Sequence, residues 1–117
     1  MTKHENIPYI EDILAAITDI QESIKGFSKD KFLSNKDKKD ANVRRLEIIG
    51  GASKNLSNEL KEEHKEIEWD KIIGTRNRII HAYSNVDIDI LWGIIKKDLP
   101  KLKKQIEKIK EELKLKN

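Results

Sequence analysis

The sequence predicts an all-α fold, an up-and-down bundle of about five helices in one domain over residues 1–117. Three observations favour this class. Apolar residues recur at three- and four-residue steps, which is the spacing of one face of an α-helix. No segment shows the alternation of apolar and polar residues that is typical of a half-buried strand. Charged residues make up 38% of the chain, enough to cover the solvent faces of amphipathic helices.

The first predicted helix has Pro8 in its first turn and ends near Gly26. Proline suits the first turn because its missing N–H has no partner there, and glycine suits a helix end. The buried face of this helix is expected to hold Ile10, Ile13, Leu14, Ile17, Ile20 and Ile24.

The second long helix is predicted from about Asp40 to Leu56, after a short turn capped by Ser28. Residues 34–39 are polar and form either a loop or the beginning of this helix. Gly50 and Gly51 weaken a helix by on the order of 1 kcal/mol each, so we expect them at a close packing contact.

The next two predicted helices are a short charged one that begins at the cap Ser57 and ends near His64, and one that runs from Trp69 to about Tyr83. A polar break follows at residues 84–87.

The last predicted helical segment is capped by Asp87. Pro100 either kinks it or lies in the first turn of a new helix capped by Asp98. The final buried stripe is expected to consist of Leu99, Leu102, Ile106, Ile109 and Leu113.

Composition limits the class of protein. The chain has no cysteine, which excludes disulfides, thiolate metal sites and cysteine nucleophiles, and no run approaches the roughly 20 apolar residues of a membrane span. His4 and His64 lack ligand spacing, so no metal site is expected. We expect a cytoplasmic protein without a cofactor, and one that gains from burying surface in an oligomer.

Side chains suited to phosphate chemistry gather between Gly74 and Tyr83. On a helix, Arg76 and Tyr83 are seven residues apart and nearly eclipsed, and Asn77 and His81 are four apart on the neighbouring strip. Arginine binds phosphate bidentately, and histidine exchanges protons near neutral pH. Asn77 is placed to fix the His81 ring by a hydrogen bond. The spacing indicates a groove lined by all four.

A purely structural interpretation of these residues stays open from spacing alone. In it, Arg76 is a surface charge, His81 an interior histidine and Tyr83 a half-buried cap of the core. One Arg and one His do not make a complete active site without a second acidic or basic group.

Two interpretations of the C-terminal lysines also stay open. They form either the solvated face of a bundle or a patch for the RNA backbone. These residues are Lys96, Lys97, Lys101, Lys103, Lys104, Lys108 and Lys110.

Taken as a whole, the chain resembles the HepT-like members of the HEPN superfamily, the toxins of toxin–antitoxin pairs with a minimal nucleotidyltransferase. Four segments carry the resemblance in order: residues 9–14, 44–50, 69–74 and 97–100. The most specific feature is Arg76, four residues, His81, one residue and Tyr83, which fits the HEPN signature. Relatives commonly carry Glu where this chain has Gly51.

The resemblance implies a homodimer in which Arg76 and His81 of both copies face one cleft. It implies metal-independent cleavage of RNA by a type II-like or type VII toxin, with His81 as general acid or base, Arg76 stabilising phosphorane charge and Asn77 orienting His81. It also implies that a cognate nucleotidyltransferase antitoxin silences the toxin by AMPylation of Tyr83. The alternative is a non-catalytic helical subunit that binds a nucleotide or the nucleotidyltransferase. A third possibility is a scaffold dimer.

Overall fold

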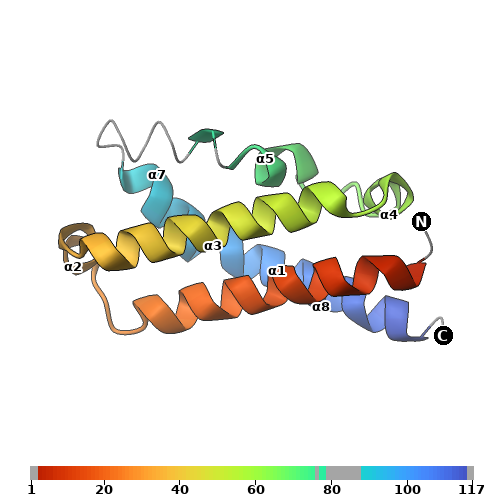
Figure 1. The fold of residues 1–117 in the computed structure, drawn as a ribbon, viewed down its shortest axis with the longest axis horizontal. Coiled ribbons are helices and arrows are strands. Elements are labelled where there is room, and N and C mark those ends of the chain that lie inside the picture. The colour runs from red at the N-terminus through yellow and green to blue at the C-terminus, as the bar shows by residue number, and fades with distance from the viewer. Residues whose placement is uncertain (1–2, 76, 79–87, 116–117) are drawn as a thin grey trace.

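The computed structural model describes residues 3–75, 77–78 and 88–115, and the regular structure within them is helical. The predicted all-α fold is therefore confirmed (Figure 1). Its elements, in chain order, are α1 (Lys3–Ile24), α2 (Lys29–Ser34), α3 (Lys36–Asn55), α4 (Asn58–Glu63), α5 (Trp69–Ile73), α7 (Ile88–Gly93), the π-helical turn η1 (Ile94–Asp98) and α8 (Leu99–Leu115).

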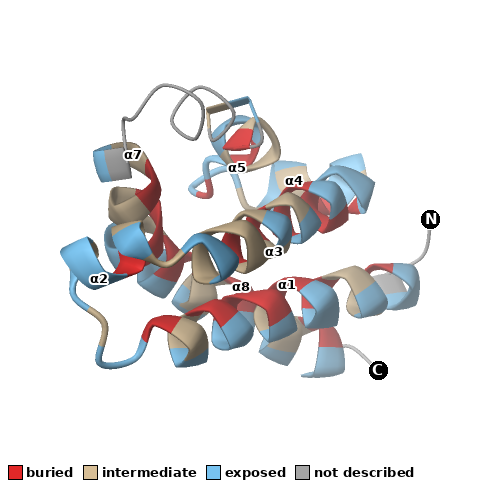
Figure 2. Ribbon diagram, turned by 60° about the vertical axis from the view of Figure 1, so that its left-hand side comes forward, coloured by how far each residue is buried: buried red, intermediate tan, exposed pale blue. Residues whose placement is uncertain are grey.

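The three long helices pack lengthwise, α1 against α3 and α1 against α8. The beginning of α1 and the end of α8 lie at the same end of the molecule (Figure 1). Buried residues follow one side of each helix and exposed residues the opposite side (Figure 2). No described helix is both long enough and apolar enough to cross a membrane.

Helix α1 begins earlier than predicted, and Pro8 lies inside it. The extra turn is held by Asn6, which is only 1% exposed. The Asn6 amide donates to Ser57 Oγ (3.1 Å) and its carbonyl accepts from the Ser57 backbone N–H (2.9 Å). This pairing of residues distant in the sequence stabilises the helical turn before Pro8, so Pro8 does not lie in the first turn of α1. The predicted end is confirmed, because Gly26 has φ of +79°.

Helix α3 also begins before its predicted first residue, at Lys36. Asn35 is the N-cap, since its side-chain oxygen accepts from the Lys38 N–H (3.0 Å). The polar segment is therefore mainly helix. Farther along, the buried Asn42 donates to Ser23 Oγ of α1 (3.2 Å).

The two central glycines differ. A Cβ on Gly50 would lie 3.3 Å from the Ile72 carbonyl oxygen and 3.4 Å from that of Ile73, so the predicted close contact is with α5. Gly51 is exposed, and a Cβ there would have nothing within 4 Å. The prediction holds for Gly50 and is wrong for Gly51, which lies on the solvent side of the same helix.

Ser57 caps α4 as predicted, and Trp69 opens α5. Contrary to the prediction of one helix to Tyr83, α5 ends at Ile73. The Gly74 N–H donates to the Asp70 oxygen (2.9 Å) and closes the helix at Gly74. The predicted remainder beyond residue 78, the break at 84–87 and the cap Asp87 lie outside the described residues.

Helices α7 and α8 are joined through η1. The Leu99 N–H donates to the Ile94 oxygen, five residues back, and Gly93 and Leu99 both keep helical backbone angles. The wide turn precedes Pro100, which lacks a backbone donor. Asp98 is thus part of a continuous helical path and does not cap a new helix.

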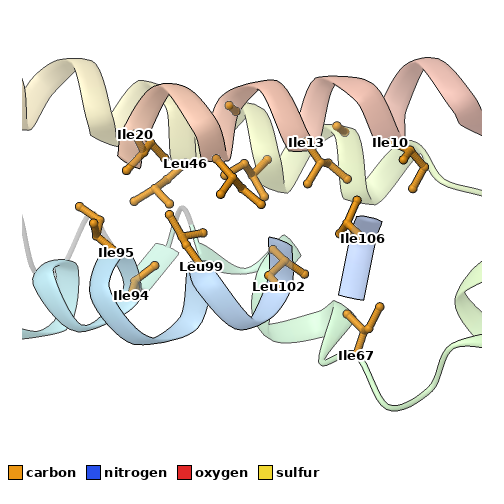
Figure 3. Packing of buried hydrophobic residues seen from close by; sticks show 14 of the residues in the cluster. Ile10, Ile13, Ile20, Leu46, Ile67, Ile94, Ile95, Leu99, Leu102 and Ile106 are labelled. Carbon is orange, nitrogen blue, oxygen red and sulfur yellow. The ribbon is translucent and has the colours of Figure 1, made fainter. Parts of the chain in front are cut away.

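The helices pack against one another around a core that consists mainly of isoleucine and leucine side chains (Figure 3). Ile13 of α1 and Ile106 of α8 point into the space between the two helices (Figure 3). The predicted final stripe is fully buried: Leu99, Leu102, Ile106, Ile109 and Leu113. The first stripe is buried too, except for Leu14, which is half-buried at its edge.

Candidate functional site

The predicted phosphate-binding motif, Arg76, Asn77, His81 and Tyr83, lies only partly within the described residues. Arg76, His81 and Tyr83 lie outside them, and Asn77 lies inside. Asn77 is exposed, and its backbone N–H donates to the Gly74 oxygen (3.0 Å). The Asn77 side chain is therefore not buried in the core. The roles of the four residues stay predictions.

The segment that leads into the motif is held firmly. The buried Thr75 donates from Oγ1 to the Lys71 oxygen (3.0 Å), and the Arg78 N–H donates to the Gly74 oxygen (3.3 Å). The helical turn thus resumes directly after Gly74. A side chain at Gly74 itself would meet the Asp70 oxygen at 3.1 Å, which favours glycine at this junction.

Helix α5 is placed by contacts at both of its ends. Trp69 is buried at the first position, and its indole N–H donates to the His64 carbonyl oxygen (3.0 Å). The last turn rests against Gly50, where the absence of a side chain lets α3 and α5 approach closely. The core therefore fixes the start of the motif through only a few contacts.

A groove with a cavity of about 120 Å³ lies beside residues 75–78, which we call the motif segment, between α3, α5 and the η1–α8 segment. Its floor is apolar and consists of Leu46, Ile49, Ile72, Ile94, Leu99 and Leu102. Its rim has acidic side chains, Glu66, Glu68 and Asp98, and basic ones, Lys71, Arg78 and Lys101. Thr75 and Arg78, which flank position 76 in the sequence, both line it. The groove thus lies between the motif segment and α8.

The charges around the groove are partly paired. Lys71 Nζ lies 4.0 Å from Asp98 Oδ2, and both side chains are largely solvated. A hydrogen bond to its own backbone lowers the pKa of the Glu66 carboxyl; desolvation opposes this shift, and His64 and Lys108 add to it. Glu66 therefore keeps its negative charge at neutral pH.

His64 lies between two carboxylates. Its Nδ1 is 3.4 Å from Glu66 Oε1, and its Nε2 is 3.4 Å from Glu112 Oε2. Through these two contacts His64 connects the turn between α4 and α5 to the last turns of α8. The part of the chain that the structure describes contains no group of three or more His, Cys, Asp or Glu side chains with metal-site geometry.

Sequence reasoning missed the groove and the part that Thr75 and Arg78 have in it. The sequence pattern assigns neither Thr75 nor Arg78 a role in the site. The floor comes from α3, α5 and the last helical path, so no local pattern indicates it.

Comparison with known proteins gives a consistent result. A family model described as "Ribonuclease HepT-like" matches residues 13–109. A probable HepT ribonuclease of Thermococcus cleftensis is 41% identical over 93% of this chain and 99% of its own length. A candidate RNase of Methanocaldococcus jannaschii is 37% identical, with 92% and 98% covered, and one of Caldanaerobacter subterraneus is 41% identical, with 87% and 91% covered. No solved structure matches the chain significantly.

Proposed function

Because this chain belongs to the HepT-like ribonuclease family, we propose that it is a metal-independent endoribonuclease that cuts RNA with Arg76 and His81. The observation that carries the proposal is the motif of Arg76, His81 and Tyr83, at the family's spacing and inside the matched residues 13–109. In the cell the protein acts as the toxin of a type II-like or type VII toxin–antitoxin pair.

The proposed reaction is an internal transfer on the RNA phosphate. His81 accepts the proton of a 2′-hydroxyl while that oxygen forms a bond to the adjacent phosphorus. Arg76 stabilises the charge of the phosphorane, and Asn77 orients the His81 ring. The bond from phosphorus to the 5′-oxygen then breaks, and that oxygen takes a proton from the second His81 of a dimer. The products are a cyclic phosphate end and a 5′-hydroxyl end.

A homodimer supplies the groups that one chain lacks. One Arg and one His provide a single acid–base group, whereas two copies facing one cleft provide two. The exposure of Asn77 supports this arrangement, because the motif segment presents a polar side chain to the outside of the bundle.

Tyr83 is proposed as the site of control. A cognate nucleotidyltransferase transfers AMP from ATP to the Tyr83 hydroxyl, with pyrophosphate as the leaving group. The added phosphate carries negative charge and bulk into the cleft and so repels the RNA backbone.

The decisive experiment is RNA cleavage by purified protein in EDTA, with analysis of the product ends. His81→Ala should lose about 10²- to 10⁴-fold in rate because the acid–base group is gone. Arg76→Ala should lose about 10²- to 10³-fold because charge stabilisation is lost. His64→Ala is the matched control, since it removes a histidine that contacts Glu66 and Glu112, and it should keep cleavage.

Cyclic phosphate ends that disappear with His81→Ala would support the proposal. If no form cuts RNA, with the wild type verified as unmodified by intact mass, the ribonuclease proposal fails. The chain is then better described as a non-catalytic subunit that binds the nucleotidyltransferase.

The control by Tyr83 has its own test. Incubation with the cognate nucleotidyltransferase and ATP should add the mass of AMP to the wild type and abolish cleavage. The chain has two tyrosines, so Tyr9→Phe serves as the matched control and should still be modified, whereas Tyr83→Phe should not. Modification of Tyr83→Phe to the wild-type level would refute the assignment.

A further inference from the structure

The seven lysines between residues 96 and 110 separate into two sets with different surroundings. Lys103 Nζ donates to Gln21 Oε1 of α1 (3.2 Å), and Lys96 Nζ lies 5.6 Å from the ring centroid of Trp92. Together with Lys110, these side chains follow one side of the helix at seven-residue steps; Lys103 and Lys110 are half-buried, and Lys96 is exposed but lies over the Trp92 ring.

The second set points to solvent. Lys97, Lys101, Lys104 and Lys108 are all exposed and follow one another at steps of four, three and four residues. At about 100° per residue this spacing puts them on one face, opposite the buried stripe of α8. We call these four residues the lysine stripe.

The charges of the lysine stripe are not neutralised by direct ion pairs with other described residues. Lys29, Lys36, Lys65 and Lys71 each lie within ion-pair distance of a carboxylate. None of the four stripe lysines has such a pair among residues 3–75, 77–78 and 88–115, although Lys108 lowers the pKa of Glu66 through space. The stripe is thus a row of available cations.

The position of the stripe relates it to the motif. Lys101 lines the groove that Arg78 and Thr75 line from the other side. The stripe extends from this rim along α8 for roughly 16 Å between Lys97 and Lys108, at about 1.5 Å per residue. An extended polyanion that reaches the motif segment can therefore continue along the stripe.

We propose that the lysine stripe binds the phosphate backbone of RNA beside the cleavage site, which rests on the proposed ribonuclease function. Lysine ammonium groups are compact cations that bind phosphate without reading base identity. A row of them follows a strand and fixes its path, so the stripe sets affinity and position and leaves base preference to other residues.

The test measures binding of a labelled single-stranded RNA by fluorescence anisotropy at several salt concentrations. All proteins carry His81→Ala, so that the RNA stays intact. Changing Lys101, Lys104 and Lys108 together to Gln should weaken binding at least about tenfold at low salt. The slope of log Kobs against log salt should fall by about 2, because three phosphate contacts are lost at about 0.7 each on a single strand.

The matched control changes Lys96, Lys103 and Lys110 to Gln on the same helix. Both triple variants lower the formal net charge from +3 by three, to zero, so a difference between them reports position and not total charge. The control should bind with the parent's affinity and salt slope. Changing Lys101, Lys104 and Lys108 to Arg keeps the cations and should restore binding.

Equal weakening in both Gln triples would overturn the proposal, because net charge alone would then explain binding. Parent-like RNA binding by the stripe triple, with loss of nucleotidyltransferase binding, would also overturn it in favour of an acidic protein surface. Absence of RNA cleavage by the unmodified wild type would refute the proposed ribonuclease function and leave the binding comparison of the triples interpretable, so the two failures are distinguishable. Thermal unfolding of each triple verifies that it is folded.

Discussion

The α1–α3–α8 core and the α5 segment beside the groove are built in different ways. The core consists of long helices with isoleucines such as Ile13 and Ile106 that are fully buried. The α5 segment is five residues long and is held by the buried Trp69, the close contact with Gly50 and the C-cap at Gly74. The difference teaches that the long helices supply most of the stability, whereas a few contacts at the two ends of α5 position the segment before the motif.

The largest effect on stability is expected in the core. Ile13→Ala should lower the free energy of unfolding by about 2–5 kcal/mol, because it removes buried methylene groups and leaves a cavity. Chemical denaturation measures the change. Ile48→Ala is the matched control on α3: its side chain is 38% exposed, and its loss should cost about 0.5 kcal/mol or less.

Arg76→Ala should likewise leave stability nearly unchanged while cleavage falls. Destabilisation by Arg76→Ala equal to that by Ile13→Ala would show that the motif is structural and would remove the separation between the two regions.

Substitution of the adjacent glycines Gly50 and Gly51 tests the contact between α3 and α5. Gly51→Ala should stabilise the protein by roughly 0.5–1 kcal/mol, because alanine favours a helix and the site is open. Gly50→Ala has the same helix preference but pushes on the Ile72 carbonyl at 3.3 Å, so it should be less stable than Gly51→Ala by about 1–3 kcal/mol. It should also slow cleavage, since α5 must shift. Equal unfolding midpoints for the two variants would contradict the close contact.

A smaller effect is expected at the start of α5. Trp69→Phe keeps a buried ring but removes the donor to the His64 carbonyl oxygen, which should cost about 1 kcal/mol. Cleavage should fall more than this change in stability implies, because the helix before the motif loses its anchor. Trp92 is half-buried, so Trp92→Phe provides the control, with ring packing against Phe32 retained and cleavage unchanged.

The smallest effect concerns pH. The pKa of Glu66 is lower in the folded protein than its usual value of 4.5, first because of its backbone hydrogen bond. Its contribution to stability is therefore complete above the unfolded pKa and is lost as pH falls through the folded pKa. In denaturation curves measured across that acid range, Glu66→Gln should depend less on pH than the wild type. Identical pH dependence would show that the Glu66 contacts have no influence on folding.

Periodicity was sufficient to predict the core, but local patterns predicted only some of the helix ends. The stripe from Leu99 to Leu113 follows local spacing, because burial on one face of a helix repeats along the chain. The early start of α1 depends on a hydrogen-bonded pair 51 residues apart, Asn6 and Ser57, which local patterns do not reveal. The end of α5 at Gly74 was missed because the spacing of the motif favoured one continuous helix.

The candidate site was predictable only where its residues lie close together in the sequence. Arg76, Asn77, His81 and Tyr83 form a motif in the sequence, and their chemistry follows from residue type. The groove depends on three parts of the fold that meet in space, so its membership required the structure. The division of the C-terminal lysines likewise depends on which of them contact α1 or Trp92.

The π-helical turn η1 has a consequence for changes in chain length. Leu91, Ile95 and Leu99 succeed one another at four-residue steps, a spacing that would drift around a regular α-helix by about 40° per step. The wider turn absorbs this drift and keeps both parts of the helix facing the core. Deletion of one residue within Ile94–Asp98 would let this turn close with regular α-helical bonds, whereas deletion of one residue within α8 would rotate everything beyond it by about 100°. The segment is therefore the part of this helical path in which the loss of one residue changes the direction of the α8 side chains least.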